Sequence, residues 1–130
     1  MQGLQELWGF NRVDYSWATA GYLGAIESGC TTCGLLIGSS VALGLRFGQG
    51  KSTIPIEDKN GRDKAVKAVK KFYLDFLKEF NSTDCQTLTS CDFSKEADAK
   101  RYMDEKIYKD RCFKYFNFVM NRFIVMEKNS

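Results

Sequence analysis

Apolar residues recur at helical spacing along much of the chain, and no segment alternates as a half-buried strand would. The clearest repeat runs from Arg62 to Phe80, where apolar positions return every three or four residues and lysines lie opposite them. This pattern predicts an amphipathic helix. Its apolar face comprises Ala65, Val66, Val69, Phe72, Tyr73, Phe76, Leu77 and Phe80.

A second segment, from about Thr32 to Phe47, is apolar and interrupted by small residues. In a helix, Gly34 and Gly38 lie one turn apart on one face, and Ala42 continues the row. Each glycine inside a helix costs about 1 kcal/mol relative to alanine, so close packing has to compensate. We therefore expect Gly38 to be buried against another helix, in the centre of the fold.

The remaining segments are shorter but also predict helices and turns. Glycines and the single proline mark residues 48–61 as a surface loop. Further helices are expected over 15–26 as a short buried helix, as a short helix that carries Cys85 after the capping residues 81–84, from Ser94 to about Lys109, and over 111–128. The sequence thus predicts an all-α fold, a compact bundle of about five helices around the glycine-rich helix. We expect one domain over 1–130, made of an aromatic-rich segment (1–29), the central segment (30–47) and the remaining helices (62–127).

Composition excludes several classes of function. The net charge is only +3 over 130 residues and the lysines are intermixed with acids, so we expect no nucleic-acid partner. The chain has no histidine, which removes the usual general base, the proximal haem ligand and every zinc site that contains histidine. Any chemistry must therefore rest on cysteine or carboxylate groups.

A membrane span is also disfavoured, although Ser28 to Leu45 carries no charge over 18 residues. Eleven of these 18 residues are Gly, Ser, Thr or Cys, which is too polar for a spanning helix and suits a buried central one. Residues 1–8 have neither the basic nor the apolar region of a secretion signal. We expect a cytoplasmic protein.

Cysteine is the residue type that carries the candidate chemistry. The chain has five cysteines, and in a reducing compartment clustered cysteines more often bind metal or react than form structural disulfides. Cys30 and Cys33 lie at the N-terminal end of the predicted central helix, three residues apart and therefore on the same side. There the helix dipole favours a thiolate.

Two further cysteines lie far along the chain, each near the start of a predicted helix: Cys85 and Cys112. The ends of helices can converge in a bundle. Four thiolates, from these two and from Cys30 and Cys33, could then hold an iron–sulfur cluster or another thiolate-bound metal. Cys91 lies on a different face from Cys85 and is interpreted as a spare thiol or a resolving partner.

The segment Cys33-Gly34-Leu35-Leu36-Ile37-Gly38, with its continuation to Gly48, resembles the small redox-active proteins named for the C_GCAxxG_C_C signature. Cys85 and Cys112 fall where that family's later cysteines would. Leu35 replaces the alanine of the motif, and residues 1–29 contain no cysteine, so Cys30 takes the place of the first cysteine or that position is missing. The resemblance implies a compact helical protein whose cysteines are redox-active or bind a metal centre, with a functional link to a transporter.

Three functions follow from these observations. The first is a redox or metal-binding protein that uses Cys30, Cys33, Cys85 and Cys112 and exchanges electrons with an unidentified redox partner. The second is thiol–disulfide exchange, in which Cys30 or Cys33 attacks and its neighbour resolves the mixed disulfide. The third is a non-catalytic interaction domain with buried cysteines, for which we expect a homodimer built on the face of Gly34 and Gly38.

Overall fold

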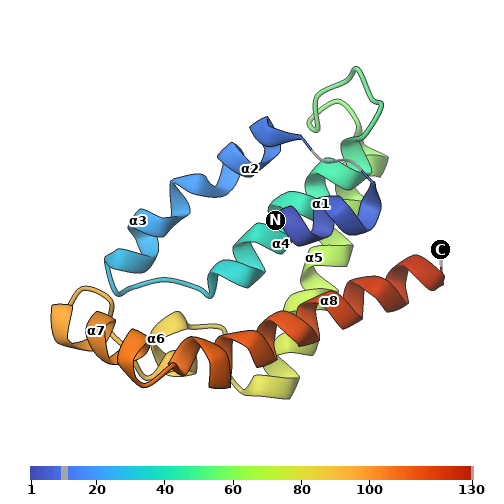
Figure 1. The fold of residues 1–130 in the computed structure, drawn as a ribbon. Coiled ribbons are helices and arrows are strands. Elements are labelled where there is room, and N and C mark those ends of the chain that lie inside the picture. The colour runs from blue at the N-terminus through green and yellow to red at the C-terminus, as the bar shows by residue number, and fades with distance from the viewer. Residues whose placement is uncertain (10–11, 130) are drawn as a thin grey trace.

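A computed structural model describes residues 1–9 and 12–129 and shows an all-α fold over them, as predicted (Figure 1). The isolated antiparallel bridge between Thr32 and Asp84 is the one β feature of these residues. The helices are α1 (Gln2–Trp8), α2 (Val13–Ala20), α3 (Tyr22–Glu27), α4 (Gly34–Gly48), α5 (Lys59–Phe80), α6 (Cys85–Thr89), α7 (Glu96–Asp104), the π-helical turn η1 (Tyr108–Cys112) and α8 (Phe113–Lys128).

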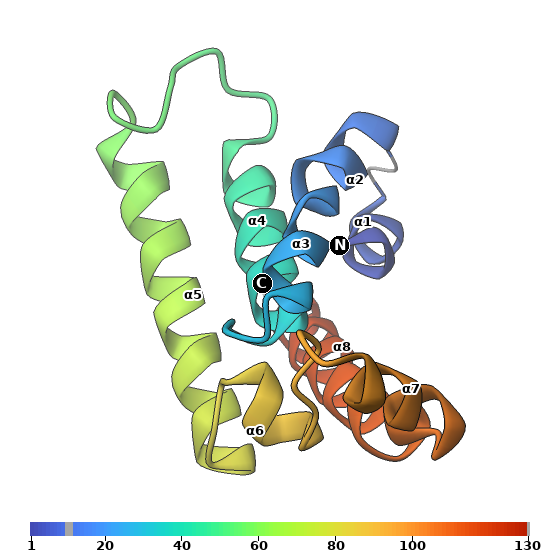
Figure 2. The same ribbon diagram turned by 90° about the vertical axis from the view of Figure 1, so that its left-hand side faces the viewer.

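The glycine-rich helix α4 contacts α5 and α8 as well as the three N-terminal helices. Figure 2 shows α4 beside α5, with the loop between them at one end of the molecule and α6 and α7 at the other. Leu36 and Leu43 of α4 and Phe76 of α5 have no exposed surface. Removing such side chains from water contributes about 1.5–3 kcal/mol each, so this contact stabilises the fold substantially.

Helix α5 matches the predicted amphipathic helix but begins at Lys59, three residues earlier than expected. The carboxylate of Asp58 accepts a hydrogen bond from the backbone N–H of Gly61 at 2.9 Å, which caps the first turn. The helix ends at Phe80, and the next residue, Asn81, has a φ of 61°, the left-handed conformation common after a helix. Side-chain capping therefore extended the helix into the predicted loop.

The row of small residues on α4 faces the N-terminal segment of the same chain. A Cβ atom added to Gly34 would lie 3.2 Å from Cδ1 of Ile26, and one added to Gly38 would lie 3.4 Å from the backbone nitrogen of Met1. Gly38 and Ala42 are buried, as expected for a face of close approach. This face is thus covered within the chain, and the homodimer remains a prediction that needs another surface.

The N-terminal segment differs from the prediction of one short buried helix over 15–26. It forms α2 and α3, and no residue of either helix is buried. Trp17 is 73% exposed and Leu23 is 60% exposed. The expectation of burial was wrong because, among the described residues, these short helices lie along the outside of α4 at the edge of the fold (Figure 1).

The predicted helix from Ser94 to about Lys109 is shorter in the structure. Helix α7 begins at Glu96, because the Ser94 hydroxyl donates instead to the Asp92 carboxylate at 2.6 Å. The chain then turns at Lys106, whose φ is 53°, and passes through η1 into α8. Within the described residues, no helix has the length and hydropathy needed to cross a membrane.

Candidate thiol site

Three cysteines from distant parts of the sequence, Cys33, Cys85 and Cys112, line one cavity of about 660 Å³. The cavity lies at the end of the molecule where α4 begins and where α6, α7 and the start of α8 gather. Most of its other lining residues are apolar. They are Leu23, Ile26, Gly34, Leu35, Phe93, Ala99, Phe113 and Phe116, with Glu27, Thr89 and Tyr102 as the polar members.

A short antiparallel pairing brings Cys33 and Cys85 together. The backbone N–H of Cys33 donates to the carbonyl of Thr83 at 2.8 Å, and the N–H of Cys85 donates to the carbonyl of Thr31 at 2.9 Å. Both cysteines directly follow the bridged residues, Thr32 and Asp84, and side chains alternate between faces in extended backbone. The pairing therefore directs both thiols to the same side.

Side chains on either side fix this pairing. The Tyr22 hydroxyl donates to the Thr32 carbonyl at 2.7 Å and also contacts the Thr31 hydroxyl. Asp84 caps α6 by accepting from the backbone N–H of Thr87 at 2.8 Å, so α6 starts immediately at Cys85. The positions of both cysteines thus depend on local hydrogen bonds as well as on the core.

Cys112 reaches the cavity from the other side, as the last residue of η1. The Tyr102 hydroxyl, from α7, donates to its sulfur with an Oη–Sγ distance of 3.1 Å. Burial, followed by this bond to Cys112, raises the pKa of Tyr102 above its ordinary value, so the phenol stays protonated and can donate. A tyrosine therefore completes the thiol cluster.

The other two cysteines, Cys30 and Cys91, lie outside the cavity lining. Cys30 is exposed and precedes α4 in non-helical backbone, so the prediction that Cys30 and Cys33 share one side of a helix is wrong. The bridge at Thr32 holds this segment extended instead. Cys91 is only 1% exposed, and its N–H donates to the Thr89 hydroxyl at 3.2 Å. All five cysteines are free thiols.

Burial controls the protonation of the lining thiols. It raises the pKa of Cys33, although N–H groups of Leu35 and Leu36 at the start of α4 act in the opposite direction. Burial, with the neighbouring Cys33 and Cys112, raises the pKa of Cys85 to about 12. The expectation that the helix start favours a thiolate is therefore wrong for Cys33, because desolvation exceeds the effect of the helix N-terminus.

The cavity offers these thiols no positive charge. Among the described residues that line it, Glu27 is the one charged side chain. A thiolate formed here needs a countercharge from a bound group, since apolar walls cannot stabilise it. Burial, which raises the pKa values of Cys33 and Cys85, therefore favours the protonated thiol at both residues.

The dimensions of the cavity bear on which group could supply that charge. Across the part of the chain that the structure describes, no three Cys, Asp or Glu side chains are close enough to hold one metal ion. Yet the cavity that the three thiols line has a volume of about 660 Å³ and is partly open to solvent. It therefore has room beside the thiols for a group of several atoms.

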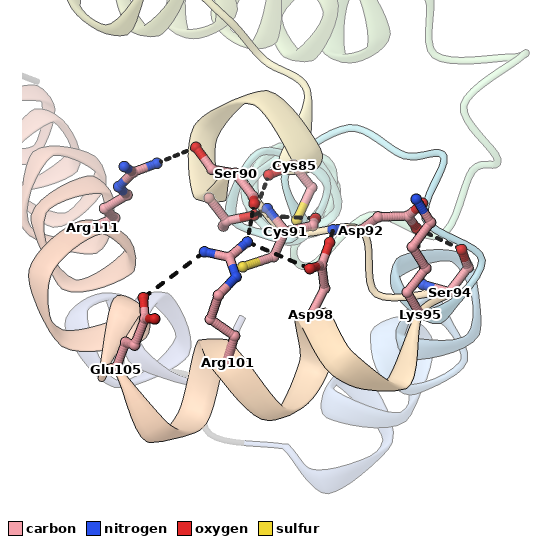
Figure 3. A network of polar contacts seen from close by, with 11 residues as sticks. Cys85, Ser90, Cys91, Asp92, Ser94, Lys95, Asp98, Arg101, Glu105 and Arg111 are labelled. Carbon is pink, nitrogen blue, oxygen red and sulfur yellow. Dashed lines mark hydrogen bonds and ion pairs between the residues drawn. The ribbon is translucent and has the colours of Figure 1, made fainter.

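A polar network joins α7, which carries Tyr102, to the loop after α6, which carries Phe93 (Figure 3). Arg101 of α7 donates to the Ser90 carbonyl and pairs with Asp98 at 3.6 Å. Asp98 in turn accepts from the backbone N–H of Asp92 at 2.8 Å. These contacts join α7, which carries Tyr102, to the loop that follows α6. These contacts therefore fix α7 and the loop after α6 relative to each other on this side of the cavity.

Sequence reasoning missed Tyr102, because neither its spacing from Cys112 nor its place on a helix distinguishes it from a packing residue. The aromatic wall at Phe93, Phe113 and Phe116 was missed for the same reason: only the tertiary arrangement brings these residues to the thiols. Helix periodicity alone would assign Phe116 to the core, yet it is 43% exposed. No local signal could have found these residues.

Comparison with known proteins agrees with the cysteine pattern. Residues 1–124 match the model of a family described as "Putative redox-active protein (C_GCAxxG_C_C)". No curated protein and no solved structure matches the chain significantly.

Proposed function

Because the chain belongs to the C_GCAxxG_C_C family of proteins described as redox-active, we propose that it is a redox protein that works through Cys33, Cys85 and Cys112. In this proposal the three thiolates hold an iron–sulfur cluster in the cavity. The observation that carries the proposal is that these three cysteines, from distant parts of the sequence, line one largely apolar cavity that is partly open to solvent.

Charge supports a bound metal centre over a reactive dithiol. Thiol–disulfide exchange requires a thiolate, and burial raises the pKa values of Cys33 and Cys85. A cluster would instead displace the thiol protons and supply the missing countercharge. The CxxC pair is also divided, because Cys30 is exposed while Cys33 is buried.

Size supports a cluster over a single ion. The described side chains include no set close enough for one ion, whereas the cavity has room for several atoms. An iron–sulfur cluster bound by thiolates would supply one-electron transfer, with a potential set by its hydrogen bonds and exposure. The apolar walls would limit access of water to it.

The ligand set follows from the lining. We propose that Cys33, Cys85 and Cys112 are required, and that Cys30, outside the cavity, is dispensable. The four-ligand alternative makes Cys30 the last ligand and requires its segment to move inward. The two versions differ in the result expected for a single substitution, Cys30→Ser.

The test is iron and sulfide content after anaerobic reconstitution of five single variants, each changing one cysteine to serine. We expect loss of the cluster in the Cys33, Cys85 and Cys112 variants, and wild-type content in the Cys30 and Cys91 variants. Cys91 is the matched control for a buried thiol outside the cavity. Circular dichroism must show that each variant is folded.

Three results would contradict this proposal. Wild-type content in any one of the Cys33, Cys85 or Cys112 variants would remove that residue from the ligand set. Loss of the cluster in the Cys30 variant would establish the four-ligand version. If no variant and no wild-type sample takes up iron, and Cys30 instead forms a disulfide with Cys33, thiol exchange is the function.

A further inference from the structure

Tyr102 places a polar hydrogen on a sulfur atom inside a largely apolar cavity. Its hydroxyl donates to Cys112 with an Oη–Sγ distance of 3.1 Å, and its ring lines the same cavity. The two residues are ten positions apart, on α7 and η1, so this contact exists only in the folded chain. Among the described residues, it is the one side-chain hydrogen bond to a lining thiol.

The phenol is held in place from several directions. The Phe93 ring meets it edge to face, with centroids 4.9 Å apart, and the Tyr108 ring lies 5.9 Å away. The preceding residue, Arg101, binds the Ser90 carbonyl and so fixes α7 against the loop after α6 (Figure 3). The donor is therefore pre-organised toward Cys112 before any group binds.

A hydrogen bond to a ligating sulfur withdraws electron density from it. This stabilises the more negatively charged, reduced form of a thiolate-bound centre more than the oxidised form. The described residues that line this largely apolar cavity include no basic side chain. One such donor therefore has a large effect on the reduction potential of a centre bound there.

We propose that Tyr102 is a positioning residue that orients the Cys112 sulfur and raises the reduction potential of the centre. This inference rests on the proposed function. It assigns to Tyr102 a role in setting the reduction potential of the centre, in addition to its packing beside Phe93.

The test compares Tyr102→Phe with Tyr108→Phe. Each change removes one phenol hydroxyl and keeps the ring, and Tyr108 contacts Tyr102 but is not part of the cavity lining. After anaerobic reconstitution, we expect Tyr102→Phe to keep wild-type iron content and to have a lower reduction potential. Tyr108→Phe should match the wild type in both. Equal potentials in Tyr102→Phe and the wild type would overturn the inference.

A second measurement tests the contact without any cofactor. In the metal-free chain, a double-mutant cycle combines Tyr102→Phe with Cys112→Ala and follows thermal unfolding. Residues in direct contact give non-additive effects, so we expect non-additivity for this pair and additivity for Tyr108→Phe with Cys112→Ala. Additive effects for both pairs would overturn the positioning role.

The two failures can be told apart. A chain that takes up no iron refutes the proposed function and, with it, any role in setting a potential. A chain that takes up iron normally, with the same potential in Tyr102→Phe, refutes only the inference and leaves the ligand set intact.

Discussion

Replacing Gly29 with alanine should destabilise the protein through two separate effects. Gly29 is buried, has a φ of 79°, and stands just before the segment that carries Cys33. A Cβ atom added there would lie 2.1 Å from Oδ1 of Asp92 and 3.2 Å from Oγ of Ser94. The substitution thus imposes an unfavourable backbone conformation and a collision with the loop after α6.

Gly50 separates these two effects. Its φ of 75° is nearly the same, but no atom lies within 4 Å of an added Cβ. A left-handed conformation costs alanine about 1–2 kcal/mol, and the stiffer unfolded chain offsets about 0.4–1 kcal/mol of this. We therefore expect Gly50→Ala to cost about 0.5–1 kcal/mol. Overpacking adds about 1–3 kcal/mol at Gly29.

Thermal unfolding followed by circular dichroism measures the difference directly. At about 4 °C per kcal/mol for a chain of this size, Gly50→Ala should lower the Tm by about 2–4 °C. Gly29→Ala should lower it by roughly a further 4–12 °C. Equal Tm values for the two variants would refute the close contact between Gly29 and the Asp92 loop. The position of the loop after α6, which contributes Phe93 to the cavity lining, would then be wrong.

Two other predictions test the core and the thiols. Gly38→Leu should lower the free energy of unfolding by about 1–3 kcal/mol or more, because Gly38 lies against the backbone of Met1. Urea denaturation measures this loss, and an unchanged denaturation curve would show that this face is open. In the metal-free protein, the pKa of Cys85 is about 12 when folded and near 9.0 when unfolded. The folded state then binds more protons between these values, so stability present below pH 9 is lost as the pH rises toward 12. Cys85→Ser should weaken this alkaline loss, and an identical pH profile would contradict the burial of the thiol.

The fold class was predictable because long helices carry their pattern locally. Phe72 and Phe76 recur at the spacing of one helical face, and both are buried in α5. The N-terminal helices were harder to predict. Trp17 and Leu23 are apolar but exposed, because α2 and α3 cover only one side of α4. Hydrophobicity alone could not show which apolar residues lack a partner.

The candidate site was predictable only in part. The positions of Cys85 and Cys112 near the starts of helices predicted that they meet Cys33, and all three line one cavity. It could not show the bridge at Thr32, which holds the preceding segment extended and leaves Cys30 outside. Nor could a helix-dipole argument foresee how strongly burial disfavours a thiolate, since burial depends on the tertiary structure.

The most direct test of the central claim is iron and acid-labile sulfide analysis of the wild-type protein, purified or reconstituted without oxygen, with its visible spectrum. The account predicts both elements in the protein and absorption that bleaches on reduction. A folded, colourless protein that retains neither iron nor sulfide after reconstitution would contradict the claim that Cys33, Cys85 and Cys112 hold a cluster.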